Sequence, residues 1–165
     1  MTPGLCYYAP VEINILIDEE FKGHLDASWL RDLAQQALAI QGIGPSAELG
    51  LFITGQERVR ELNLSYRGKD AFTDVLAFPM MPAGGEASAA FVPPPDGLHH
   101  LGEVIISYPQ AVIQAGEQGH PVDREIAILL IHGILHLLGY DDQYPELKEK
   151  MRAREREILS RSEIN

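Results

Sequence analysis

The sequence predicts an α+β fold in which helices cover a small mixed sheet of about four strands. Short segments with strand-like alternation are interspersed with segments whose apolar residues recur at helical spacing. The apolar run at residues 126–131 lies inside a longer helical pattern, which indicates a central buried helix. A length of 165 residues with 45% hydrophobic and 22% charged residues fits one domain over residues 1–165.

The strands are predicted where apolar residues alternate with polar ones or form short runs. Residues 11–17 alternate at first, which is typical of a strand with one buried face. Three further segments have this character: residues 48–54, 73–80 and 103–107. Together they supply the four strands of the predicted sheet.

The helices are predicted from periodicity and from end signals. The first spans residues 27–41, with Asp26 or Ser28 as its cap and with Gly42 and Gly44 after it. The others are expected at residues 56–66, 108–118, 121–138 and 146–159. Charges of both signs alternate along the last helix, so we expect a solvated helix stabilised by pairs one turn apart.

A change in composition separates the third and fourth predicted strands. Residues 80–100 are rich in Pro, Gly and Ala and include three consecutive prolines. Such a segment has little apolar periodicity and too much proline to pair as a strand, so we expect a flexible surface loop. His99 and His100 end it, and a flexible loop gives adjacent histidines no fixed geometry for a metal.

The segment from His132 to Asp142 is the most informative part of the chain. His132 and His136 are four residues apart, so a helix places both rings on one face. Gly139 can adopt a left-handed backbone conformation without steric cost, which ends the helix and turns the chain back. Asp142 can then approach the two histidines. The pattern predicts a metal site with His132, His136 and Asp142 as ligands.

Two imidazoles and one carboxylate leave a coordination position open, which is typical of catalytic rather than structural zinc. We therefore expect one zinc ion per chain, with another divalent metal as the alternative. A second interpretation is that the two histidines are ordinary core residues. A membrane span is disfavoured, because the apolar run is too short to cross a bilayer.

Composition limits the compartment and the partners. Cys6 is the only cysteine, so no internal disulfide can form, and the first ten residues lack the basic and apolar runs of a targeting signal. A cytoplasmic location is expected. The net charge of −11 disfavours nonspecific binding to nucleic acid, and we expect neither DNA nor a membrane as a partner.

Three blocks of the sequence resemble a known family. They are LNLSYRGKDAFTDVLAFP at residues 62–79, LGEVIIS at 101–107 and HGILHLLGYDD at 132–142. In this order they resemble the YbeY family of bacterial endoribonucleases. The resemblance implies a metal-dependent, single-strand-specific endoribonuclease that acts in rRNA processing, at the 3′ end of 16S rRNA, and in ribosome quality control. It implies single-stranded RNA, rRNA and the small ribosomal subunit as partners, and suggests a ribosome-associated GTPase.

One residue departs from the family pattern, since a third histidine usually stands where this chain has Asp142. Aspartate is a competent zinc ligand, but its charge makes the metal a weaker Lewis acid and favours oxygen-preferring metals. Arg67 matches the family's arginine and is the candidate phosphate clamp, unless it pairs with Asp70 or Asp74. Asp141 also matches the family and is expected to support the ligands.

Arg67, His132 and His136 are thus the candidate catalytic residues. Two other functions remain open. A zinc metalloprotease would carry a glutamate directly after the first histidine as its general base, and this chain has Gly133 there. A non-enzymatic ribosome assembly factor could use the metal only to stabilise the turn after Gly139.

Overall fold

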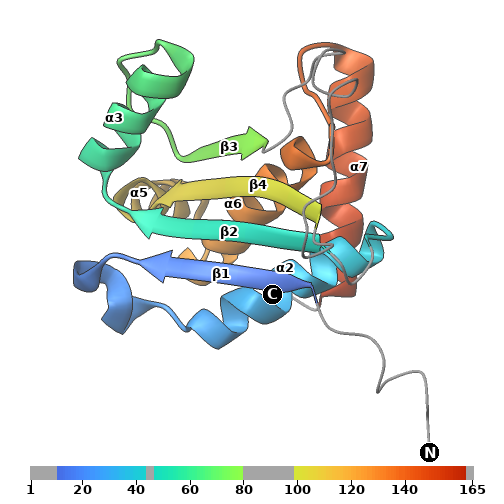
Figure 1. The fold of residues 1–165 in the computed structure, drawn as a ribbon, viewed down its shortest axis with the longest axis horizontal. Helices are drawn as coiled ribbons and strands as arrows, with labels where there is room; N and C mark the ends of the chain where they lie inside the picture. Colours follow the sequence, from blue (N-terminus) through green and yellow to red (C-terminus); the bar gives the residue numbers. More distant parts are fainter. Residues whose placement is uncertain (1–10, 44–46, 80–98, 163–165) are drawn as a thin grey trace, which may run out of the picture.

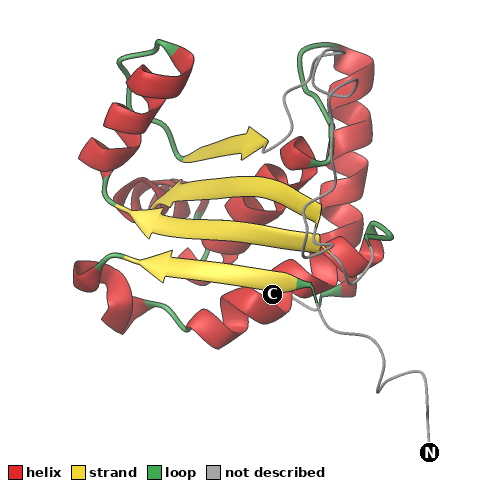
Figure 2. Cartoon of the chain, in the orientation of Figure 1, coloured by secondary structure: helices red, strands yellow, loops and turns green. Residues whose placement is uncertain are grey.

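The computed structural model describes residues 11–43, 47–79 and 99–162. Four strands form one sheet, and most of the helices lie on one of its faces (Figures 1 and 2). The strands are β1 (Glu12–Ile17), β2 (Ala47–Thr54), β3 (Val75–Pro79) and β4 (His99–Ser107). The helices are the 3-10 helix η1 (Glu19–His24) and the α-helices α2 (Ala27–Ile40), α3 (Gln56–Arg67), α5 (Tyr108–Gln118), α6 (Val122–Leu137) and α7 (Pro145–Arg161).

The sheet is mixed, with the strand order β1-β2-β4-β3. β1, β2 and β4 run parallel, whereas β3 pairs antiparallel with β4 and forms an edge. This confirms the predicted α+β class and the mixed sheet of four strands. The antiparallel edge brings the segment that follows α3 next to the central helix, and the candidate site lies there.

Helix α6 occupies the centre of the main core. It packs against β3 and β4 and against the helices α2, α5 and α7 (Figure 1). Nine of its residues are buried, among them the fully enclosed Ile126, Leu130 and Ile134. Because apolar residues on nearly every side of this helix are removed from water, its burial is a major source of stability. The helix that carries the two histidines is therefore rigidly placed.

The other face of the sheet is only partly covered. There Val59 of α3 packs with Leu76 and Ile105, and Phe52, Leu62 and Phe78 border this smaller core. Beyond it, this face of β1 and β2 is more open, and Leu16 is 61% exposed. The two faces of the sheet therefore differ: a layer of helices packs on one, and the other is a shallow, partly exposed surface.

Gly133 sets the distance between α6 and the sheet. A Cβ atom built at this position would lie 2.6 Å from a methyl carbon of Val104 on β4. Such contacts are too short for carbon atoms, so any larger residue would push the helix and the strand apart. A glutamate here, as in the metalloprotease pattern, would meet the sheet.

Most predicted elements lie within a few residues of the observed ones, but the fourth strand was predicted too short. It begins at His99, four residues before the predicted start, because His99 and His100 pair with Ala47 and Glu48 of β2. The prediction of a loop over 80–100 is therefore wrong at its end, and residues 80–98 lie outside the described part. The 3-10 helix η1 was not predicted. No helix in the described ranges is long and apolar enough to cross a membrane.

Candidate metal centre

The turn after α6 has the geometry that the glycine predicted. Gly139 has a φ of 99°, in the region that favours glycine. The amide of Tyr140 donates to the carbonyl of Leu135 and the amide of Gly139 to that of His136, at 3.0 Å each. These two bonds form a Schellman motif, which satisfies the last carbonyls of the helix. The chain then reverses and leads Asp142 back to the histidines.

Three potential ligands converge at this end of α6. The Nε2 atoms of His132 and His136 are 3.1 Å apart, and one carboxylate oxygen of Asp142 completes a cluster in which all ligand atoms lie within 4.8 Å of one another. Two nitrogens with bonds of about 2.0–2.1 Å to one tetrahedral zinc ion lie about 3.3 Å apart. The donor set and the spacing therefore fit a divalent metal.

Each histidine is also held from outside the cluster. Nδ1 of His132 lies 2.6 Å from Oε2 of Glu155 on α7. His136 forms a hydrogen bond with the backbone of Tyr140, which belongs to the turn after Gly139. The contact with Glu155 uses Nδ1 of His132 and leaves its Nε2 directed at Nε2 of His136. This is the arrangement by which proteins orient metal-binding histidines.

The two rings respond differently to their surroundings. Burial opposes the charged form of His132, but the hydrogen bond and the negative charge of Glu155, with smaller effects of Asp142 and Asp74, raise its pKa above 6.5. Burial lowers the pKa of His136 below 6.5, and the neighbouring His132 lowers it further. A proton shared in the cluster therefore belongs mainly to His132 when no metal is bound.

Arg67 faces the same cavity as the cluster. This cavity has a volume of about 440 Å³ and is lined by β3, by the two histidines, by Asp142 and by Arg67, the last residue of α3. Arg67 is exposed, and within the described ranges it forms no ion pair. Asp70 pairs with Arg60 at 2.6 Å instead. The expected alternative, a salt bridge from Arg67 to Asp70 or Asp74, is thus not found.

Asp74 is fixed by other groups. One of its oxygens accepts from the backbone amide of Val75 at 2.7 Å, and the other lies 3.3 Å from the side-chain amide of Gln114. Asp141, which the sequence marked as a support, accepts from the backbone amide of Gln143 at 3.0 Å. It therefore shapes the turn that carries Asp142.

Sequence reasoning missed Glu155. The alternation of charges along α7 predicted a solvated helix, which gave Glu155 no role in the site. In fact Met151 and Ile158 are buried, and Glu155 lies between them on the face towards α6. The spacing of Met151, Glu155 and Ile158 at positions i, i+4 and i+7 is the signal that could have identified this face.

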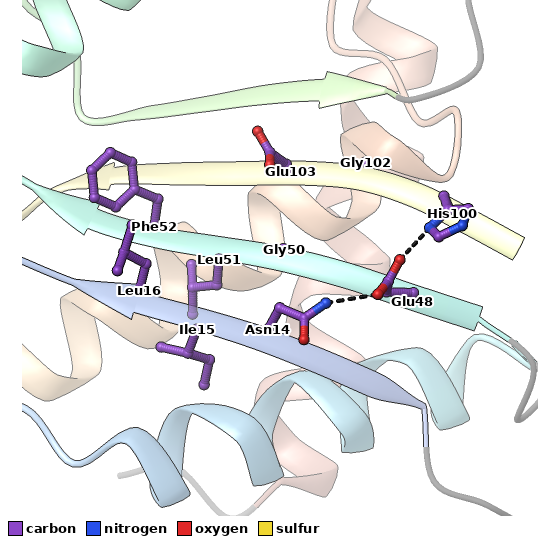
Figure 3. A pocket seen from close by; sticks show the side chains of 10 residues that line it. All are labelled: Asn14, Ile15, Leu16, Glu48, Gly50, Leu51, Phe52, His100, Gly102 and Glu103. Carbon is purple, nitrogen blue, oxygen red and sulfur yellow. Dashed lines mark hydrogen bonds and ion pairs between the residues drawn. The ribbon is translucent and has the colours of Figure 1, made fainter. Parts of the chain in front are cut away.

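A further hollow, of about 310 Å³, lies on the open face of the sheet (Figure 3). There the carboxylate of Glu48 bridges two neighbours, the ring of His100 and the side-chain amide of Asn14. Among the described residues, the groups of this hollow do not form a cluster of potential metal ligands. His100 contacts Glu48 and does not belong to the candidate centre, and the side chain of His99 is outside the described part.

Comparisons with known proteins identify the family of the chain. The family model described as endoribonuclease YbeY matches residues 15–163. The chain is 53% identical over 134 residues to endoribonuclease YbeY of Dehalococcoides mccartyi strain CBDB1, which covers 79% of this chain and 81% of that protein. It is 39% identical over 148 residues to the protein of the same name from Roseiflexus sp. strain RS-1, covering 89% and 90%.

A solved structure supports the fold. The solution structure of TM1509 from Thermotoga maritima matches with a TM-score of 0.57 at 26% identity, over 92% of this chain and 91% of that one. The family model matches nearly the whole chain, and the two relatives share 53% and 39% of its residues over the aligned regions. The chain belongs to the endoribonuclease YbeY family.

Proposed function

We propose that the chain is a metal-dependent, single-strand-specific endoribonuclease that acts in rRNA processing and ribosome quality control in the cytoplasm, as one functional domain. The 3′ end of 16S rRNA is the proposed substrate region. The observation that carries the proposal is the convergence of His132, His136 and Asp142 in one cavity with Arg67, which forms no ion pair with any described residue. The edge strand β3 lines one side of this cavity.

His132, His136 and Asp142 are the proposed metal ligands, and one zinc ion is the proposed occupant. When bound, such an ion supplies a Lewis acid that polarises a phosphoryl oxygen and lowers the pKa of water. The chain contributes the orientation of the donors. Glu155 holds Nδ1 of His132 and leaves its Nε2 directed at Nε2 of His136. The carboxylate of Asp142 reduces the positive charge of the centre.

Arg67 is the proposed clamp for the scissile phosphate. A guanidinium can donate two parallel hydrogen bonds to phosphate oxygens, and its charge stabilises the negative charge that grows on them during attack. Its exposure and its lack of an ion pair within the described ranges leave those donors available. Lysine at this position would supply the charge without the bidentate geometry.

The acidic surroundings bear on the choice of partner. Another cavity, of about 300 Å³, lies on the α7 side of His132. It is lined by four carboxylates and two basic residues: Asp74, Glu125, Asp142, Glu155, Lys148 and Arg152. With a net charge of −11, the chain attracts bare RNA weakly. We propose that the small ribosomal subunit presents the single strand, with a ribosome-associated GTPase as a further partner.

The test is metal content and RNA cleavage of the wild type beside Asp142→Ala and Asp142→His. We expect one metal ion per chain in the wild type and loss of metal and cleavage in Asp142→Ala. Asp142→His, which supplies the family's usual ligand, should keep the metal. Glu146→Ala removes an exposed carboxylate of α7 and is the matched control. If Asp142→Ala keeps both metal and cleavage, the ligand assignment is wrong.

Arg67→Ala separates catalysis from a purely structural role of the metal. It should keep the metal and the fold and lose cleavage of a single-stranded fragment from the 3′ end of 16S rRNA. A non-enzymatic assembly factor would instead show no cleavage in the wild type, and metal removal would unfold its turn. A metalloprotease would cleave peptides, although Gly133 leaves it without the expected base.

A further inference from the structure

We propose that Glu155 is a positioning residue for metal binding, which selects the tautomer of His132 that can bind a metal. The inference rests on the proposed role of His132 as a ligand, and it adds a residue outside the three converging side chains. Its basis is the 2.6 Å contact between Oε2 of Glu155 and Nδ1 of His132. A carboxylate at this distance accepts a hydrogen bond from the Nδ1–H group.

The tautomer decides whether the ring can serve as a ligand. A neutral imidazole carries its single proton on one of two nitrogens, and only the other nitrogen has a free lone pair. With the proton held on Nδ1 by Glu155, the Nε2 lone pair of His132 faces Nε2 of His136 at 3.1 Å. In the opposite tautomer a proton would occupy the position where a metal must bind.

Packing fixes Glu155 in this role. Met151 and Ile158, one turn before and one turn after it, are 1% and 0% exposed and anchor α7 to the core. The side chain of Glu155 is 20% exposed, less than that of any other glutamate of α7 that forms an ion pair. The arginines beside it find other partners, because Arg154 pairs with Glu157 and Arg156 with Glu149.

The two histidines are thus oriented in different ways. His136 relies on the backbone of Tyr140, which no side-chain substitution removes. His132 relies on one side chain from another helix. Loss of Glu155 should therefore change the orientation of the His132 ring and leave that of His136 unchanged. The packing of α7 along α6 thus serves to place Glu155 beside His132.

The first measurement is the tautomer of His132 in metal-free protein, from long-range ¹H–¹⁵N correlation NMR at a pH where the ring is neutral. We expect the Nδ1–H tautomer in the wild type and a shift towards Nε2–H in Glu155→Ala. Glu155→Gln keeps an oxygen acceptor and should retain much of the Nδ1–H form. Glu157→Ala removes the same charge one half-turn away and should leave the ring unchanged.

The second measurement is the affinity for Zn²⁺, by competition with a chromophoric chelator. We expect about a 10–100-fold loss in Glu155→Ala, the range typical of removing a group that orients a metal-binding histidine. Glu155→Gln should lie between Glu155→Ala and the wild type, and Glu157→Ala should match the wild type. Thermal unfolding of each metal-free variant shows whether the fold is intact.

The results separate this inference from the proposed function. If Glu155→Ala keeps both the Nδ1–H tautomer and the wild-type affinity, the positioning role is wrong even where the enzyme is active. If the wild type binds metal and does not cleave RNA, the proposed function fails while both measurements still test Glu155. An equal loss of affinity in Glu157→Ala would mean that only the overall charge of α7 matters, which would also overturn the inference.

Discussion

Two histidine–glutamate pairs lie at opposite ends of α6, and only one belongs to the candidate centre. His132 contacts Glu155 at 2.6 Å, and His120 contacts Glu125 at 2.7 Å. Their distances and chemistry are nearly the same. In the first pair the remaining ring nitrogen faces His136 and Asp142. In the second pair the remaining oxygen of Glu125 accepts from Gln114 at 2.8 Å.

The difference shows what distinguishes the candidate metal centre from an ordinary histidine–carboxylate pair. In the His120 pair the two carboxylate oxygens of Glu125 are both used, one by the His120 ring and the other by the side-chain amide of Gln114. Glu125 is only 5% exposed, so such satisfaction is needed for its burial. In the His132 pair, Nε2 of the ring does not contact the glutamate, and it faces two further potential ligands, His136 and Asp142. Both pairs thus contain a contact between a histidine and a carboxylate. The candidate metal centre differs because further side chains with unused lone pairs converge on its histidine.

The largest expected effect is on metal binding. His136→Ala should lower the affinity for Zn²⁺ by more than about 100-fold, because it removes a proposed ligand and not only a group that orients one. His120→Ala, the matched change in the other pair, should leave the affinity unchanged. Chelator competition measures both variants. Equal losses of Zn²⁺ affinity in the two variants would show that the candidate centre does not bind the metal in preference to the His120–Glu125 pair.

A smaller effect is expected on stability, in the opposite pair. Glu125→Ala removes the acceptor of the His120 ring and the shorter of the two contacts of the Gln114 amide, which keeps Asp74 at 3.3 Å, so the free energy of unfolding should fall by about 1–3 kcal/mol. The affinity for Zn²⁺ should stay at the wild-type value. Urea unfolding of metal-free protein checks the first statement. A Glu125→Ala protein of full stability would show that the network does not support the core.

The smallest expected effect is a pH dependence of the metal-free protein. The pKa of His132 is raised above 6.5 in the folded protein, so the protonated ring stabilises the folded state relative to the unfolded one. This stabilisation is lost as the pH rises through the folded pKa of His132. The lowered pKa of His136 has the opposite sign, and its effect is to reduce stability as the pH falls below 6.5. Together the two histidines favour a stability maximum near pH 6.5.

Urea unfolding with a chelator present, measured across this range, checks the prediction. Glu155→Gln should weaken the loss on the alkaline side, since the negative charge that raises the His132 pKa is gone. The acidic side should change little. If the wild type and Glu155→Gln have the same profile above pH 6.5, the contact with Glu155 does not control the protonation of His132.

Much of the fold followed from local patterns. The cap at Asp26, which accepts from the amide of Ser28, and the left-handed Gly139 are short-range features that a sequence records directly. The same holds for the i,i+4 spacing of His132 and His136. The start of β4 could not be obtained in this way, because pairing with β2 incorporates His99 and His100 despite the loop-like composition before them.

The sequence by itself determined the three converging side chains, since one helical turn and one glycine turn connect them within eleven residues. It also determined the α+β class, through segments of different periodicity. Only the tertiary structure decided that Arg67 shares their cavity, that Gly133 lies against Val104 and that Glu155 orients His132. Each of these contacts joins residues far apart in the chain, and local propensity carries no information about which distant segments meet. Packing of α6 against β3, β4 and α7 brings them together.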